Sequence, residues 1–223
     1  MRLTGDDHAR VSAAVTQAER GTAGEIVTVV AGRSDAYHDA ALHYAVLAML
    51  GVLAVLAARP DWAMALWVAV DRNGWEAPPA GAPLAVALVL ATIAFLLVRV
   101  GLAPARLRFA LTPGVTKTRR VRRQALALFR VGAERRTRGR TGVLIYLSLG
   151  ERRAEIIADA AIHDRVAPDV WGEAMAALIA DVRDARPGDG LVAAVALVGA
   201  VLTEHFPRGE NDVNELPDRL VDL

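Results

Sequence analysis

Residues 142–160 read GVLIYLSLGERRAEIIADA, and this stretch decides the fold of the chain. Residues 142–149 form a nearly continuous apolar run, which is typical of a strand buried on both faces. The charged residues 151–153 make a polar turn, and residues 154–160 predict an antiparallel partner strand. The stretch therefore predicts a β-hairpin inside a packed domain.

A further strand is predicted well upstream of this hairpin. Glu25–Ala31 reads EIVTVVA and is rich in β-branched residues. Before it, Thr4 and Asp7 form a variant capping box, and apolar residues at helical spacing predict a helix. A lone strand would leave its backbone hydrogen-bonding groups unsatisfied, so Glu25–Ala31 is expected to pair with the 142–149 strand. The two segments should therefore belong to one domain.

Helices are predicted on the faces of this sheet. Residues 115–136 show the pattern of a basic amphipathic helix, and Pro168 is a typical opening residue of another. Residues 187–190, PGDG, are expected to break the chain before the apolar residues 191–206, which predict a buried core helix or, alternatively, a third membrane helix. The fold class expected is α/β, a compact α/β/α sandwich with a small mixed sheet.

Two long apolar segments interrupt this domain. Residues 40–58 carry no formal charge, and residues 83–103 carry only Arg99, near one end. Each is close to the ~20 residues that cross a hydrocarbon core. The chain of 223 residues is 54% hydrophobic with mean hydropathy +0.30, yet 23% charged, so a transmembrane helical hairpin joined to a water-exposed domain is expected. The predicted parts are a first domain segment, a hairpin, a second domain segment and an acidic tail, at residues 1–39, 40–103, 104–207 and 208–223.

Charges on either side of the hairpin predict its orientation. The connector carries two positive and three negative charges, at Arg59, Asp61, Asp71, Arg72 and Glu76. The stretch after the second segment carries seven positive charges, at Arg106, Arg108, Lys117, Arg119, Arg120, Arg122 and Arg123. The positive-inside rule then places both termini in the cytoplasm of a bacterial cytoplasmic membrane. Residues 62–70 contain interface-favouring tryptophans and are expected to lie flat on the outer surface or to form a re-entrant helix.

Several passages are similar to the TPM-domain family, including its bacterial membrane members with an inserted two-helix hairpin. The similar residues are Ala18, Glu19, Thr22, 24–27, Ser34, Tyr37, 140–149, 151–153, 155–159 and 214–218. The resemblance implies a compact α/β/α sandwich and a divalent-cation site, most often for calcium, near loops at one sheet edge. It also implies acid phosphatase activity in some members and binding of membrane complexes in others. This chain departs at residues 139–142, GRTG, where an arginine replaces the family's acidic turn and argues against calcium.

Candidate chemistry rests on few residues, and none is assigned a catalytic role. There is no cysteine, which excludes disulfides, thiolate metal sites and a cysteine nucleophile. Glu25, Asp159 and Asp164, with His163 beside them, are candidate ligands for Ca²⁺ or Mg²⁺. The alternative is that Asp159 and Asp164 cap the turn before the next helix and that Glu25 is a solvated strand end. Five arginines are candidates for binding a phosphate or a lipid headgroup, or alternatively form a solvated surface. They are Arg119, Arg120, Arg122, Arg123 and Arg140.

Two functions are compatible with these features. In the first, the chain anchors a TPM-like domain that supports assembly, quality control or regulation of a membrane complex without catalysis. In the second, it is a membrane-bound phosphatase that depends on a divalent cation. The expected partners are the lipid bilayer and another membrane protein or a second copy of the chain. Nucleic acid is not expected, because the net charge is +1 and no aromatic platform accompanies the arginines.

Overall fold

Two compact units divide the chain in the computed structural model. Unit 1 consists of Met1–Asp35 together with Gly114–Leu223, and unit 2 is Ala36–Pro113. The structure describes residues 2–71, 78–132, 141–209 and 219–223. Unit 2 is longer than the predicted 40–103 hairpin at both ends, since residues 36–39 and 104–113 also belong to it.

Unit 1 is built on a four-stranded mixed sheet with the order β3-β2-β1-β4. β1 (Glu25–Ala31) pairs in parallel with β2 (Gly142–Ser148), and β2 pairs antiparallel with β3 (Arg153–Ala158). The predicted pairing of the upstream strand with the hairpin is therefore confirmed. β4 (Val221–Asp222) adds to the free edge of β1 in parallel. The end of the predicted acidic tail thus returns to the sheet; a two-residue strand is too short to leave a sequence pattern.

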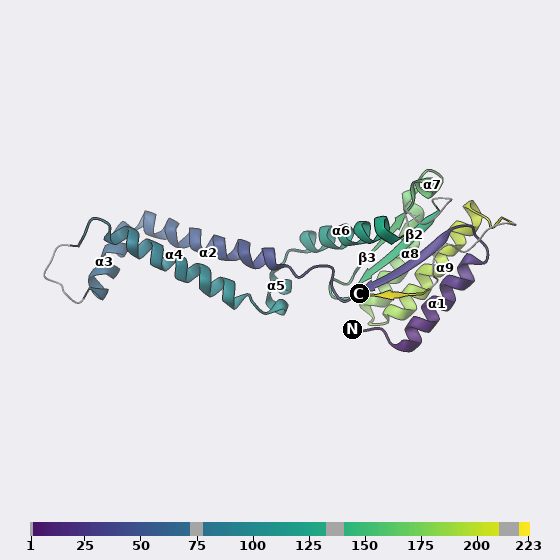
Figure 1. Ribbon diagram of the computed structural model, residues 1–223, viewed down its shortest axis with the longest axis horizontal. Coiled ribbons are helices and arrows are strands. Elements are labelled where there is room, and N and C mark those ends of the chain that lie inside the picture. The colour runs from purple at the N-terminus through teal and green to yellow at the C-terminus, as the bar shows by residue number, and fades with distance from the viewer. Residues whose placement is uncertain (1, 72–77, 133–140, 210–218) are drawn as a thin grey trace. The chain divides into compact units, whose positions relative to one another are not determined.

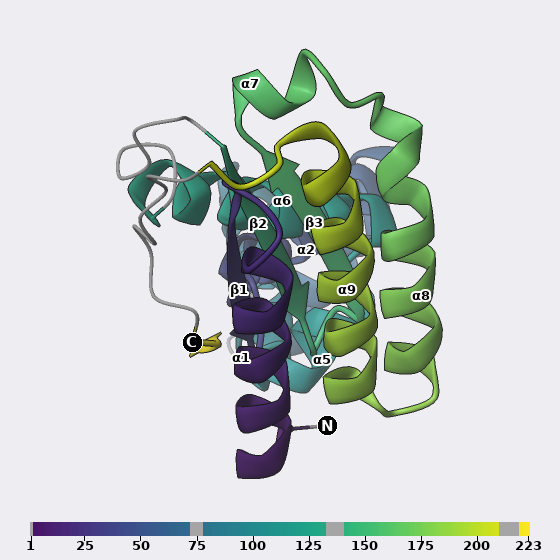
Figure 2. The same cartoon turned by 90° about the vertical axis from the view of Figure 1, so that its right-hand side faces the viewer.

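One face of the sheet is covered by three long helices, which Figure 2 shows side by side in front of the strands. They are α1 (Gly5–Glu19), α8 (Trp171–Arg183) and α9 (Pro187–His205). Their buried side chains form one core with every second residue of the strands, among them Ile26, Val143 and Ile145. The apolar helix α9 buries Leu191, Val195 and Leu202 in this core, as predicted for a core helix.

The opposite face of the sheet packs against α6 (Gly114–Gly132). Val121, Ala125 and Phe129 of α6 form a second core with the strand residues that point to this side, such as Leu144 and Tyr146. Two short helices complete the unit: α7 (Ala160–His163) follows β3, and the 3-10 helix η1 (Pro168–Val170) precedes α8. β3 ends before the predicted residue 160, because Asp159 already occupies the N-cap position of α7. Unit 1 is therefore a mixed α/β fold.

Residues 187–190 do not break the chain as expected; they form the first turn of α9. Pro187 suits a first helical position, where its missing N–H costs nothing. The glycines permit close packing: a Cβ at Gly188 would overlap the carboxylate of Asp7, and one at Gly199 would lie 2.6 Å from Cβ of Ala18. The glycines that suggest a chain break in the sequence instead allow α9 to pack closely against its neighbouring helices.

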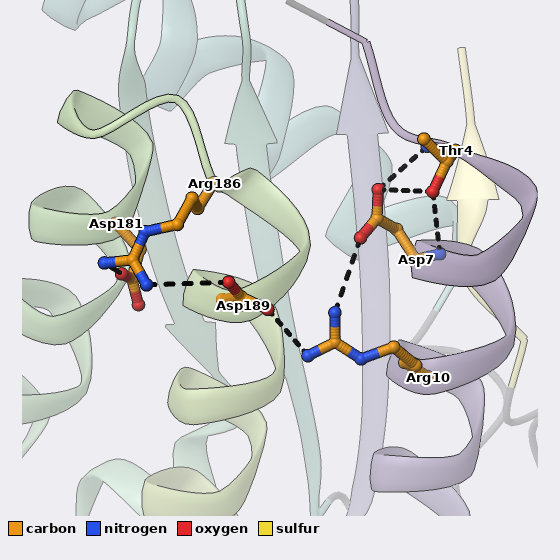
Figure 3. A network of polar contacts seen from close by, with 6 residues as sticks. All are labelled: Thr4, Asp7, Arg10, Asp181, Arg186 and Asp189. Carbon is orange, nitrogen blue, oxygen red and sulfur yellow. Dashed lines mark hydrogen bonds and ion pairs between the residues drawn. The ribbon is translucent and has the colours of Figure 1, made fainter.

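Charged side chains join the ends of α1, α8 and α9, as Figure 3 shows. Asp7 accepts hydrogen bonds from the backbone N–H and hydroxyl of Thr4, which completes the predicted capping box of α1. Arg10 lies 2.6 Å from Asp189 at the start of α9 and 3.7 Å from Asp7. Arg186 bridges Asp181 and Asp189, at 2.5 and 3.6 Å. The chain of charges therefore ties three helix ends together.

Acid should weaken this link at Asp7. Hydrogen bonds from the backbone and hydroxyl of Thr4 hold the pKa of Asp7 below its usual 3.8. Its stabilising contribution is therefore complete above pH ~4 and is lost as the pH falls through the lowered pKa. We expect Asp7→Asn to flatten the stability loss below pH 4, and Thr4→Ala to cost about 1 kcal/mol at pH 7. Urea unfolding between pH 7 and pH 3 measures both; an unchanged acid slope in Asp7→Asn would contradict the assignment.

Unit 2 consists of helices with exposed apolar side chains. α2 (His38–Ala58) and α4 (Ala82–Gly101) lie side by side, followed by the short helix α5 (Ala105–Leu111), and α3 (Pro60–Val70) stands between them in the chain (Figure 1). Leu47, Leu88 and Leu97 are 62–69% exposed, and such surface is costly in water. Three helices of the described chain are long and apolar enough to cross a membrane: α2, α4 and α9. Half of the α9 segment is buried inside unit 1, against 17% for α2 and 6% for α4.

Candidate functional site

Two predicted carboxylates lie at one end of the sheet, where β1 and β2 begin. Glu25 is paired with Gly142 on one side, and the backbone of Asp159 pairs with Gly142 on the other. The alternation of the strands turns Glu25 and Asp159 to the same face as Val29 and Ile157, and Gly142 between them has no side chain. Neighbouring strands are about 4.8 Å apart, so the two carboxylates flank one glycine across roughly two strand spacings.

Both of these carboxylates are buried. Glu25 is 6% exposed and Asp159 is 4% exposed. One oxygen of Asp159 accepts the backbone N–H of Gly142 at 3.1 Å, while the backbone N–H of Asp159 donates to the carbonyl of Gly142 at 2.9 Å. A buried carboxylate is costly unless it is hydrogen-bonded or paired, and this pair of bonds also fixes where β2 starts. Asp159 therefore has a structural role whatever else it does.

The third predicted ligand is placed differently. Asp164 caps the C-terminus of the single-turn α7, and both Asp164 and His163 are exposed. Within the described ranges, no group of three or more His, Cys, Asp or Glu side chains could hold a metal ion. The structure thus places Glu25 and Asp159 at one end of the sheet and leaves Asp164 exposed. Arg140, the predicted phosphate ligand nearest in sequence, lies outside the described residues.

A second polar cluster lies at the opposite end of β1 and β2 and was not singled out from the sequence. The carboxylate of Glu151, 7% exposed, accepts the backbone N–H of Ser34 at 3.2 and 3.3 Å and the hydroxyl of Ser148. The hydroxyls of Ser34 and Tyr146 are hydrogen-bonded at 2.9 Å. The available signal was a tyrosine and a serine spaced two apart in a strand that is otherwise apolar, followed by an acid in the turn.

Burial defines the chemistry of Tyr146 in this cluster. Its side chain is fully buried, and desolvation raises the pKa of its phenol above 10.0. The hydrogen bond with Ser34 lowers this pKa in part, and the nearby charge of Glu151 adds a smaller rise. The phenol therefore stays protonated at physiological pH and serves as a hydrogen-bonding group. This cluster holds the segment after β1 against β2, just before the chain enters unit 2.

The predicted arginines of α6 separate into two groups. Arg120 is ion-paired with Asp35 at 2.8 Å, both side chains being 22% exposed, and Arg123 reaches the same carboxylate at 3.3 Å with its side chain 67% exposed. Arg119 and Arg122 are exposed. Arg122 acts on Glu155 of β3: burial raises the pKa of Glu155, and the charge of Arg122 lowers it in part. Arg120 is thus a structural residue, whereas Arg119 and Arg122 face solvent.

Removing the acceptor of the second cluster should be costly. Glu151→Leu leaves the backbone N–H of Ser34 and the hydroxyl of Ser148 without their acceptor in a buried site, at about 1–3 kcal/mol for each unsatisfied group. Glu151→Gln keeps one carbonyl acceptor and should lose less than half as much. Thermal unfolding of both variants, compared with the exposed Glu173→Gln, measures the difference. Equal loss in the Leu and Gln variants would show that the hydrogen bonds do not carry the effect.

Unit 2 contains a cavity of a different character. It has a volume of about 470 Å³ and lies between α3 and α4, lined by Leu66, Trp67, Val86 and Val89 with Asp71 at its edge. Its size falls within the range of ligand pockets. The lining is almost wholly apolar, so this cavity offers contacts to apolar groups and no set of reacting groups.

Comparisons with known proteins establish the fold class. No family model matches the sequence. No curated protein matches it either. The structure is similar to the NMR structure of BA42 protein from the psychrophilic bacterium Bizionia argentinensis, with a TM-score of 0.58 and 17% sequence identity over 100% of this chain and 97% of that chain. At this identity the similarity shows a shared mixed α/β fold.

Proposed function

We propose that the chain is a membrane-anchored TPM-like domain that supports assembly, quality control or regulation of a membrane protein complex without catalysis. The observation that carries the proposal is the exposure of α2 and α4. Each is about 20 residues long and almost free of charge, and few of its residues are buried within the protein. Such surface is stable in hydrocarbon and unstable in water. Unit 2 is then the transmembrane hairpin and unit 1 the water-exposed domain.

The location of the hydrophobic cores supports the assignment of unit 2 to the membrane and of unit 1 to water. Both hydrophobic cores of the described chain consist of residues of unit 1 alone, whereas unit 2 turns its large apolar side chains outward. Arg99 in the last turn of α4 and the arginines that follow it suit the cytoplasmic side of a bacterial membrane, with both termini on that side. The exposed Trp62 and Met64 of α3 suit a helix lying in the outer interface.

Membrane extraction and labelling test the anchor. Membranes washed with alkaline carbonate should retain the full chain. Because the chain has no cysteine, Ala80→Cys and Glu173→Cys give single labelling sites in the connector and in α8. An impermeant maleimide added to intact cells should label position 80 and spare position 173. Release by carbonate would overturn the anchor, and the reverse labelling pattern would invert the topology.

The alternative is a divalent-cation-dependent phosphatase, and the observation that favours it is that Glu25 and Asp159 are both buried on the same face and at the same end of the sheet. Two carboxylates can supply part of the oxygen coordination of Ca²⁺ or Mg²⁺. The purified chain should be assayed with a generic phosphomonoester, with and without either ion. Turnover abolished by Glu25→Gln, in a variant whose unfolding temperature is unchanged, would overturn the non-catalytic proposal. If the purified chain shows no turnover and no metal-dependent thermal shift, the phosphatase function is excluded.

A further inference from the structure

The outer face of α6 carries four exposed arginines. Arg119, Arg122, Arg123 and Arg130 are exposed and recur at spacings of three, four and seven residues, which places them on one side of a helix. The other side of α6 carries Val121, Ala125 and Phe129 and is buried against the sheet. The fold therefore fixes this set of arginines in an outward direction; we call these four residues the α6 outer arginines.

These arginines serve no common purpose in the packing of unit 1. Arg120 is not one of the four and has a structural role, because it forms the short ion pair with Asp35. Arg123 touches Asp35 with one nitrogen, yet two thirds of its side chain is exposed. Arg119 and Arg130 are exposed. Four like charges along one helix face repel each other, so an anionic surface would be favourable for them.

Chain connectivity limits where this surface can be. α6 begins at Gly114, the residue that directly follows unit 2. At a rise of 1.5 Å per residue, Arg119 and Arg123 lie on the order of 8–14 Å along the helix from that junction. These distances are between one and two Debye lengths at physiological salt, where one Debye length is about 8 Å, whereas Arg130 lies about 24 Å along the helix. An anionic bilayer at the junction therefore acts most strongly on the first turns of α6.

We propose that the α6 outer arginines bind the anionic phospholipid headgroups of the bilayer that holds unit 2. Guanidinium groups match phosphate oxygens with two parallel hydrogen bonds and stay charged at any physiological pH. The contact would fasten unit 1 to the membrane surface by a second, lipid-dependent attachment besides the hairpin. The proposal rests on the proposed function, because it takes unit 2 to be in the bilayer.

The test uses the full chain reconstituted in nanodiscs of phosphatidylcholine alone or with 30% phosphatidylglycerol. A single cysteine at the exposed Ala127, beside the arginine row, carries a fluorophore, and a quencher is placed at headgroup level. We expect strong quenching with phosphatidylglycerol and weak quenching without it. Each guanidinium group near the membrane surface should increase the binding constant for anionic headgroups roughly fivefold. The triple variant Arg119→Gln, Arg122→Gln and Arg130→Gln should therefore lose nearly all of the lipid-dependent quenching.

A matched triple variant controls for net charge. Arg2→Gln, Arg20→Gln and Arg183→Gln removes the same charge from exposed positions elsewhere on unit 1 and should quench like the parent chain. Addition of 20 mM inorganic phosphate should not compete if the ligand is the bilayer surface. Equal quenching in both lipids, equal loss in both triple variants, or competition by free phosphate would each overturn the proposal. Carbonate extraction of the same samples keeps the anchor separate: an anchored chain without lipid dependence refutes this inference alone.

Discussion

Replacing Ala36–Pro113 with a Gly/Ser linker of about eight residues should leave unit 1 as a soluble folded domain, if unit 2 is the membrane anchor proposed above. Both described cores belong to unit 1, and the parallel pairing of β1 with β2 bridges the junction. Asp35 at one cut end is already ion-paired with Arg120 in α6, which starts at the other. A short flexible linker therefore closes the chain at little entropic cost.

The expected readout is a shift of nearly all the protein to the soluble fraction, with a cooperative urea transition. The control inserts the same linker between Pro113 and Gly114 and keeps unit 2; it should stay in the membrane. If the excised protein is folded but still sediments with membranes after a high-salt wash, unit 2 is not the main anchor. If it loses its cooperative transition, unit 1 needs the hairpin in order to fold.

Gly199→Leu should be the most damaging single substitution in the helical layer. Even a Cβ at position 199 would lie 2.6 Å from Cβ of Ala18, and the neighbouring contact is the backbone of the same residue at 3.3 Å. Neither partner can rotate away, so α1 and α9 must move apart and open the core that Leu191 and Leu202 share with α1. We expect a loss of about 3 kcal/mol, at the upper end of typical overpacking costs.

Position 200 offers a control of the same size on the same helix. Ala200 is exposed and lines an open groove between α1 and α9, so Ala200→Leu adds the same side chain into open space and should change stability by under about 0.5 kcal/mol. Gly199→Ala should fall between the two, because a gain in helix propensity of about 1 kcal/mol opposes the overlap. Urea unfolding compares the three variants. Similar stability of Gly199→Leu and Ala200→Leu would show that the helices do not pack as closely as described.

A comparison of the glycine-rich residues 187–190 with the capping box of α1 shows where local sequence misleads. Residues 187–190 carry Pro and two glycines, which locally favour a break, yet they open α9 because Gly188 must admit Asp7 and Gly190 must admit the carbonyl of Leu178. In contrast, Thr4 and Asp7 fulfil their capping box as the sequence predicts, since both partners are three residues apart. Contacts between helices can override a local preference, whereas contacts within one turn cannot contradict it.

The sequence by itself determined β1, β2 and β3, the pairing of β1 with β2, and the two long apolar helices of unit 2. These follow from local periodicity, from the length of uncharged segments and from the requirement that strand backbones be hydrogen-bonded. Tertiary structure alone decided that β4 closes the sheet edge, that Glu25 and Asp159 flank Gly142 while Asp164 stays exposed, and that Glu151 joins Ser34 to β2. The physical reason is sequence distance: such groups meet through strand register and packing, which no local pattern of residues encodes.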